Sequence, residues 1–168
     1  MTVNYLKSVI GFIFFLLLQS LILNNVSFFG WGTPFLYIYF LITLPSNLSR
    51  NLQLTIGFLM GLGIDIFANT LGVNAFASVV AMTFRPHLLN LFKSRDDQDT
   101  FSPSFQSYGT GNFIRYSTTL VILHHFALYT IQLFRLNDAS ILALKIGASA
   151  LVTLIIIQLL ESLKSTNK

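Results

Sequence analysis

The chain has 168 residues, of which 54% are hydrophobic and only 10% are charged, and its mean hydropathy is +0.70. A soluble domain needs about 25% charged residues to cover its surface, so this composition excludes an ordinary soluble protein and predicts an integral membrane protein. The chain has no cysteine, which excludes disulfides and thiolate catalysis, and its net charge of +4 indicates helix orientation in a membrane rather than nucleic-acid binding.

Runs of apolar residues predict one multi-pass domain over residues 1–168, an all-α bundle of six transmembrane helices. Because about 20 apolar residues span a bilayer, we expect the first helix at 6–23. It ends in Asn24 and Asn25 without a small-residue cleavage site, so we interpret it as a retained anchor. The remaining spans are expected at 34–44 with 28–32 leading in, 54–71, 73–92, 116–134 and 139–160.

Basic residues predict the orientation of this bundle. In a six-span layout Arg135 lies on one side, and the other loop and terminal cations lie on the opposite side, so both termini are expected in the cytoplasm. The segment 94–112, with its acids, Pro103 and two glycines, is expected to be a solvated cytoplasmic loop. The cations on the cytoplasmic side are Lys7, Arg50, Arg85, Lys93, Arg95, Arg115, Lys164 and Lys168.

Asp65 is the one acid inside the long apolar stretch 57–80. Placing a carboxylate at bilayer depth costs about 2.5–3.5 kcal/mol even on the most lenient insertion scale, so such a group faces protein, water or a partner. Counting about 1.5 Å per residue from the predicted helix ends places His124, His125 and Lys145 at a comparable depth. We therefore expect Asp65 to pair with Lys145 or to hydrogen-bond a histidine.

These residues form a predicted polar core for which two interpretations stay open. His125 shares a helix stripe with Tyr129 and Gln132, so we place it, rather than His124, on the more polar face. The interpretation we favour is a structural clasp that fixes the register of the helices. The alternative is a proton or ligand site inside the bundle.

Glycines on the third predicted span indicate close helix packing. Gly57, Gly61 and Asp65 follow one another at four-residue spacing and therefore share one face. Small residues at this spacing let another helix approach closely in lipid, and Gly63 is interpreted as a packing residue as well. Gly72 ends the short turn 69–72, which makes the third and fourth spans antiparallel neighbours.

Catalytic and metal-binding motifs are missing from the sequence. Adjacent histidines point about 100° apart on a helix, so His124 and His125 do not form a metal pair. No HExxH motif, phosphate-binding loop or GxSxG elbow is present. We therefore expect a protein that is not an enzyme and has no metal or cofactor.

The segment GLGIDIFANTLGVNAFA, residues 61–77, carries a resemblance to a known family. It has a Gly-x-x-x-Asp core at Gly61 and Asp65, followed by a Leu-Gly-x-Asn/His-Ala turn that includes Gly72 and Asn74. This pattern resembles the signature of the bacterial rod shape-determining MreD family, and His124 with His125 and Phe126 is similar to a feature of its Bacteroidetes members. The motif covers about a tenth of the chain, and the rest matches in layout more than in letters.

The MreD resemblance implies a non-enzymatic scaffold subunit of the cell-elongation machinery in the bacterial inner membrane. Its partners would be the bitopic protein MreC, the filament MreB and the peptidoglycan synthases RodA and PBP2, together with membrane lipid. The resemblance also implies a fold similar to the S components of ECF vitamin transporters, with Asp65 as the motif acid. The apolar outer face of helix 6–23 is expected to contact lipid, with a partner's transmembrane helix as the alternative.

The competing hypothesis is a small-molecule-binding membrane subunit of an ECF-type transporter. Such a protein should bring several polar and aromatic groups together in one cavity. A scaffold should instead bury Asp65 in a closed set of contacts. The polar residues at membrane depth are few, which favours the scaffold.

Overall fold

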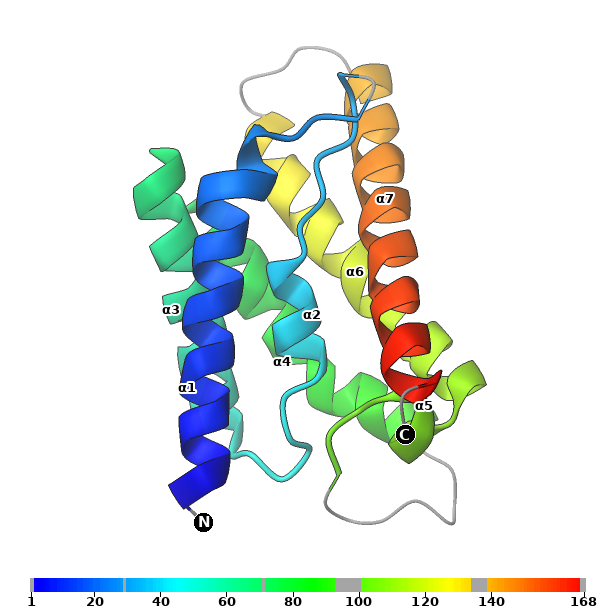
Figure 1. The fold of residues 1–168 in the computed structure, drawn as a ribbon. Coiled ribbons are helices and arrows are strands. Elements are labelled where there is room, and N and C mark those ends of the chain that lie inside the picture. The colour runs from blue at the N-terminus through cyan, green and yellow to red at the C-terminus, as the bar shows by residue number, and fades with distance from the viewer. Residues whose placement is uncertain (1, 29, 71, 93–100, 134–138, 167–168) are drawn as a thin grey trace.

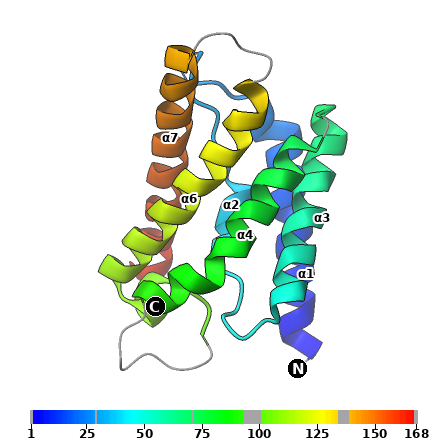
Figure 2. The same cartoon turned by 180° about the vertical axis from the view of Figure 1, so that it is seen from behind.

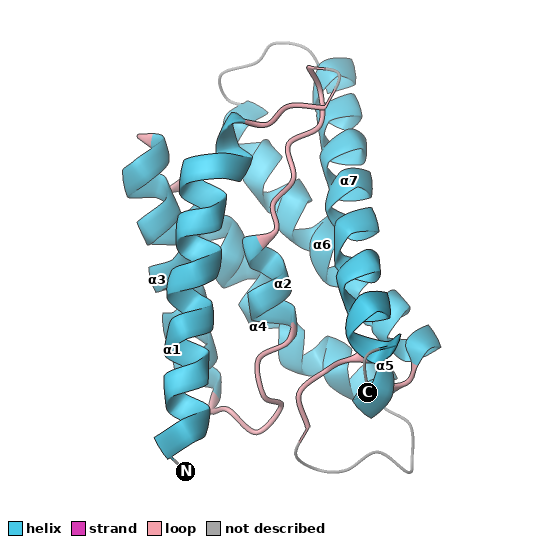
Figure 3. Ribbon diagram, in the orientation of Figure 1, coloured by secondary structure: helices cyan, strands magenta, loops and turns pink. Residues whose placement is uncertain are grey.

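The computed structural model describes residues 2–28, 30–70, 72–92, 101–133 and 139–166, and these ranges are mainly helical (Figure 3). In this part of the chain the only β-type pairing is an isolated antiparallel bridge between Phe28 and Gly32. Three helical segments are long and apolar enough to cross a membrane: Leu6–Asn25, Arg50–Ala68 and Ser140–Thr166. The predicted all-α class is confirmed for the described residues, and the long apolar helices are compatible with a membrane protein.

The helices follow one another with short connections. The first, α1 (Thr2–Leu17), continues through a π-helical turn, η1 (Leu18–Ile22), and a 3₁₀ turn, η2 (Leu23–Asn25). The others are α2 (Tyr37–Ile42), α3 (Arg50–Ala68), α4 (Val73–Phe92), α5 (Phe105–Tyr108), α6 (Thr110–Leu133) and α7 (Ala139–Thr166).

The passes of the chain alternate in direction between two ends of the molecule (Figure 1). One end, which we call the terminal end, holds Thr2, Arg50, Phe92 and Thr166, and the opposite turn end holds Ala68 and the start of α4. Seen from behind, α3 packs on α4, α4 on α6 and α6 on α7 (Figure 2). This path has the alternation that a six-span layout requires.

Two further helices, α4 and α6, are 20 and 24 residues long, so their length would suffice to cross a bilayer. They are absent from the three most apolar segments because they carry more polar side chains, such as Arg85 on α4 and the two histidines on α6. The six-span interpretation therefore stays a prediction for these helices.

The predicted helix boundaries agree best at the α3–α4 hairpin. The helix expected at 73–92 is observed as α4, while α3 begins four residues earlier than expected, where the Ser49 hydroxyl accepts a hydrogen bond from Leu52 N. The loop predicted at 94–112 is wrong in its second half, because α5 and the start of α6 lie there. Its first half, up to residue 100, lies outside the described residues.

The span predicted at 34–44 is wrong in length, since only the six residues of α2 are helical. Pro34 and Pro45 flank this helix, and a proline disfavours helical backbone at the residue before it. Six residues rise about 9 Å, far less than the hydrocarbon thickness of about 30 Å. The rest of this pass is irregular backbone, which is tolerated at membrane depth only where it is buried in protein.

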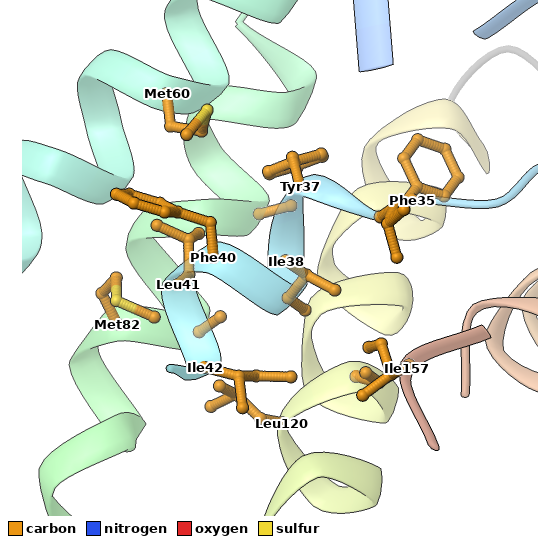
Figure 4. Packing of buried hydrophobic residues seen from close by; sticks show 14 of the residues in the cluster. Phe35, Tyr37, Ile38, Phe40, Leu41, Ile42, Met60, Met82, Leu120 and Ile157 are labelled. Carbon is orange, nitrogen blue, oxygen red and sulfur yellow. The ribbon is translucent and has the colours of Figure 1, made fainter. Parts of the chain in front are cut away.

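The core of the molecule is built around α2. Tyr37, Ile38, Leu41 and Ile42 are fully buried, and Figure 4 shows them among side chains from the surrounding helices. Those side chains are Met60 of α3, Met82 of α4, Leu120 of α6 and Ile157 of α7, all fully buried. The short helix is therefore enclosed by the longer ones rather than exposed to lipid.

Candidate functional site

Asp65 lies in the last turn of α3 with its side chain 2% exposed. One carboxylate oxygen, Oδ1, accepts hydrogen bonds from Asn74 N at 3.0 Å, from Asn74 Nδ2 at 2.9 Å and from the Thr70 hydroxyl. The other oxygen, Oδ2, accepts from Ala75 N at 2.9 Å. All four donors belong to the turn between α3 and α4 or to the first residues of α4.

This arrangement caps α4 from the preceding helix. The residue before α4 is Gly72, which has a φ of +76° and no side chain that could accept from the first backbone N–H groups. The Asp65 carboxylate accepts from the second and third residues of α4, the positions that an ordinary N-cap side chain serves. Its negative charge also lies at the positive end of the helix dipole.

The backbone of Asp65 ends α3 at the same place. Its carbonyl oxygen accepts from Asn69 N and, at 2.9 Å, from Thr70 N. Asn69 adopts the left-handed conformation, with a φ of 52°, which is the usual way to terminate a helix. One residue therefore stabilises both the end of α3 and the start of α4.

The predicted pairing of Asp65 with Lys145 or with a histidine is wrong. Asp65 lies near a helix end rather than at mid-span, so donors of its own turn are the closest ones available. Lys145 is half-buried on α7, and its ammonium group has no hydrogen-bond or ion-pair partner among the described residues.

His124 reaches Asp65 only through two intermediate side chains. Its Nε2 lies 2.5 Å from the Tyr37 hydroxyl, which lies 3.5 Å from Asn74 Oδ1, and Asn74 in turn donates to Asp65. Nδ1 of His124 is buried and has no partner in the described part of the chain. Since an unpaired acceptor is tolerated better than an unpaired N–H, we assign the proton to Nε2. Every hydrogen bond of this chain then points toward the carboxylate.

His125 belongs to a separate set of contacts. Its Nδ1 lies 2.8 Å from the carbonyl oxygen of Val121, and its Nε2 lies 3.4 Å from the Thr153 hydroxyl. Both histidines are fully buried, so the prediction that separated His125 from His124 by polarity of face is wrong, and it is His124 that connects to the Asp65 group. Within the described residues, no three His, Asp or Glu side chains lie together as metal ligands would.

Side chains of four different helices complete the hydrogen bonding of the irregular backbone around α2. At the turn end, Ser149 and Thr153 of α7 accept from Thr33 N and Phe35 N, both at 3.0 Å. Gln19 donates to the Pro34 carbonyl at 3.0 Å and accepts from Tyr37 N at 3.4 Å.

At the terminal end, Arg85 of α4 and Tyr116 of α6 serve the carbonyl groups that follow α2. The Arg85 guanidinium donates to the carbonyl of Leu44, to that of Ile42 at 3.4 Å, and to Gln53 Oε1 at 2.8 Å. The Tyr116 hydroxyl donates to the Ile42 carbonyl at 3.1 Å. Arg85 is fully buried, so its predicted place among the exposed cytoplasmic cations is wrong.

The glycines of α3 lie at close contacts with neighbouring helices. A Cβ atom on Gly61 would be 2.4 Å from Asn74 O, and one on Gly57 would be 2.6 Å from Met82 Cγ, so both glycines face α4. Gly63 faces α1 instead, where a Cβ atom would be 2.5 Å from Leu16 Cδ1. The face shared by Gly57, Gly61 and Asp65 is thus the face that packs against α4.

A cavity of about 250 Å³ lies at the turn end, beside the partners of Asp65. Thr70 and Asn74 line it together with Lys145, Trp31 and Tyr129. Lys145 and Asp65 therefore border the same region without touching, because Thr70 and Asn74 stand between them.

Comparison of the chain with models of protein families, with curated proteins and with solved structures gave no match.

Proposed function

We propose that the chain is a non-enzymatic scaffold subunit of the bacterial cell-elongation machinery, the role of the MreD family that residues 61–77 resemble. In this proposal it crosses the inner membrane six times, with both termini in the cytoplasm. It binds an MreC-like bitopic protein and connects it to MreB and to the wall synthases RodA and PBP2.

The observation that carries the proposal is the closed environment of Asp65. Its carboxylate accepts four hydrogen bonds, all from Thr70, Asn74 and Ala75, and it is 2% exposed. A carboxylate with this set of donors is held in place and has no free position for a substrate or an exchangeable proton. Its contribution is to fix α3 against α4, which is what a protein that presents a rigid surface to partners requires.

The distribution of polar side chains supports the same role. Gln19, Arg85 and Thr153 are buried, and their hydrogen bonds go mainly to backbone groups around α2. The outward faces of the first and last helices are apolar, with Phe14 and Leu159 more than half exposed. Such faces suit lipid and the transmembrane helix of a partner, since packing drives helix association in a bilayer.

The test is co-purification of the full chain after mild detergent extraction from its own cells. Recovery of an MreC-like coiled-coil protein would support the scaffold. In the same cells, Asp65→Ala should abolish rod shape or prevent accumulation of the protein, whereas Gly147→Ala, at an open position of α7, should do neither. Normal morphology at normal levels of the Asp65→Ala protein would contradict the proposal.

One observation favours a second candidate, a small-molecule-binding membrane subunit of an ECF-type transporter. The cavity at the turn end brings unpaired Lys145 together with Trp31, Tyr129 and Gln132. Its volume of about 250 Å³ is slightly below the usual range of ligand pockets, about 300–1,000 Å³. Recovery of an ATP-hydrolysing pair of proteins in the co-purification would favour this candidate over the scaffold.

A further inference from the structure

The helices α1 and α3 touch near the turn end and separate toward the terminal end. The contact is made by Leu16 against Gly63. Below it, between the two helices, lies an apolar groove of about 820 Å³. Its walls include Val9, Phe12, Leu44, Leu52, Ile56 and Leu59.

The length of this groove indicates what can occupy it. Along α3 it extends from Leu52 to Leu59, seven residues or about 10 Å, whereas the hydrocarbon core of a bilayer is about 30 Å thick. The contact of Leu16 with Gly63 closes it above. A partner's transmembrane helix needs the whole depth of the bilayer and would not fit along it. An acyl chain from one leaflet fits this length.

A polar cavity adjoins the groove at the terminal end. Leu48 and Phe101 line both, and the second cavity has a volume of about 280 Å³. Arg50, His87 and Asn90 contribute its polar lining, and neither Arg50 nor His87 has a hydrogen-bond or ion-pair partner among the described residues. No acidic residue lines either cavity, so the polar region complements a negatively charged group.

We propose that the groove and the polar cavity together form a binding site for an anionic phospholipid of the leaflet at the terminal end. An acyl chain occupies the groove between α1 and α3. The phosphate lies at the rim formed by Leu48 and Phe101, where Arg50 neutralises it and Asn90 donates a hydrogen bond. This site is independent of the scaffold role.

The test uses the purified full chain in nanodiscs that contain equal amounts of phosphatidylglycerol and phosphatidylcholine. Native mass spectrometry counts the lipids that stay bound after release. The wild type should retain phosphatidylglycerol in preference to phosphatidylcholine, and Arg50→Gln should reduce the retained phosphatidylglycerol about fivefold. Arg115→Gln, an exposed arginine at the same end of α6 and outside both cavities, should leave retention unchanged.

A second pair of variants tests the groove itself. Ile56→Trp fills the groove and should lower retention of both lipids, while Ile122→Trp adds the same bulk to an exposed position of α6 and should not. Circular dichroism confirms that each variant is folded. Equal retention of the two lipids by the wild type, equal losses in Arg50→Gln and Arg115→Gln, or full retention by folded Ile56→Trp would each overturn the proposal.

Discussion

Asp65 and Asn74 are joined by two hydrogen bonds to a single oxygen atom, since Oδ1 of Asp65 accepts from both the backbone N–H and the side-chain amide of Asn74. The two residues are nine positions apart and belong to different helices. This double contact fixes the angle at which the chain leaves α3 and enters α4.

Replacing Asp65 by alanine should destabilise the protein by at least about 2 kcal/mol. The change removes the cap of α4 and leaves buried donors of Asn74 and Ala75 without an acceptor. Thermal unfolding in detergent, followed by circular dichroism, measures the loss. Asp65→Asn keeps one acceptor oxygen and should lose less. Identical unfolding temperatures for wild type and Asp65→Ala would contradict the capping role.

Gly61→Ala should destabilise the α3–α4 hairpin by about 1–3 kcal/mol, because the new Cβ atom would meet the backbone of Asn74 and Ala75 at 2.4–2.5 Å. Gly147→Ala on α7 is the matched control, since nothing lies within 4 Å of its Cβ position. There alanine should be neutral or stabilise the helix by up to about 1 kcal/mol. Equal unfolding temperatures for the two variants would show that the close contact at Gly61 is not limiting.

Arg85→Met should destabilise the protein by about 2–4 kcal/mol, although methionine suits an apolar interior. The carbonyl groups of Ile42 and Leu44 and the amide oxygen of Gln53 would lose a buried donor. The same change at exposed Arg115 should stay within about 0.5 kcal/mol. If unfolding showed Arg85→Met to be as stable as Arg115→Met, the guanidinium would not be needed to close the end of α2.

Gln19→Leu should loosen the backbone around α2 locally. Its side chain serves both the carbonyl of Pro34 and the amide of Tyr37, so their loss raises the population of locally opened states. Hydrogen exchange followed by mass spectrometry should be faster in the peptide containing Tyr37 and unchanged in α4. Thr119→Val, whose hydroxyl bonds only the Arg115 carbonyl of its own helix, is the control. Unchanged exchange near Tyr37 would contradict the role of Gln19.

The α3–α4 hairpin could be predicted from the sequence because its signals are local. A continuous apolar pattern, the spacing of Gly57 and Gly61, and the turn at Gly72 all lie within a few residues of the structure that they determine. The length of α2 could not be predicted in this way. Its flanking prolines are visible, but the donors and acceptors that make a broken helix tolerable lie as far away as Ser149 and Thr153.

The partners of Asp65 were missed for a related reason. Counting residues along separate helices compares depths, but it ignores the polar atoms of the turn that follows the acid. A signal was present in the sequence, since Thr70 and Asn74 lie five and nine residues after Asp65 and both can donate to a carboxylate. Polar residues in a turn next to a buried acid are therefore closer candidates than distant ones at equal depth.

The backbone contacts of Thr33 and Phe35 with α7 have a consequence for how the chain is made. Ribosomes synthesise Ser149 and Thr153 more than a hundred residues after the segment that they stabilise. Until the last helix has left the ribosome and entered the bilayer, these two amide groups lack their acceptors in the finished protein. The second pass therefore reaches its final place only when translation is nearly complete, and a product truncated before residue 149 leaves it exposed to membrane quality-control proteases.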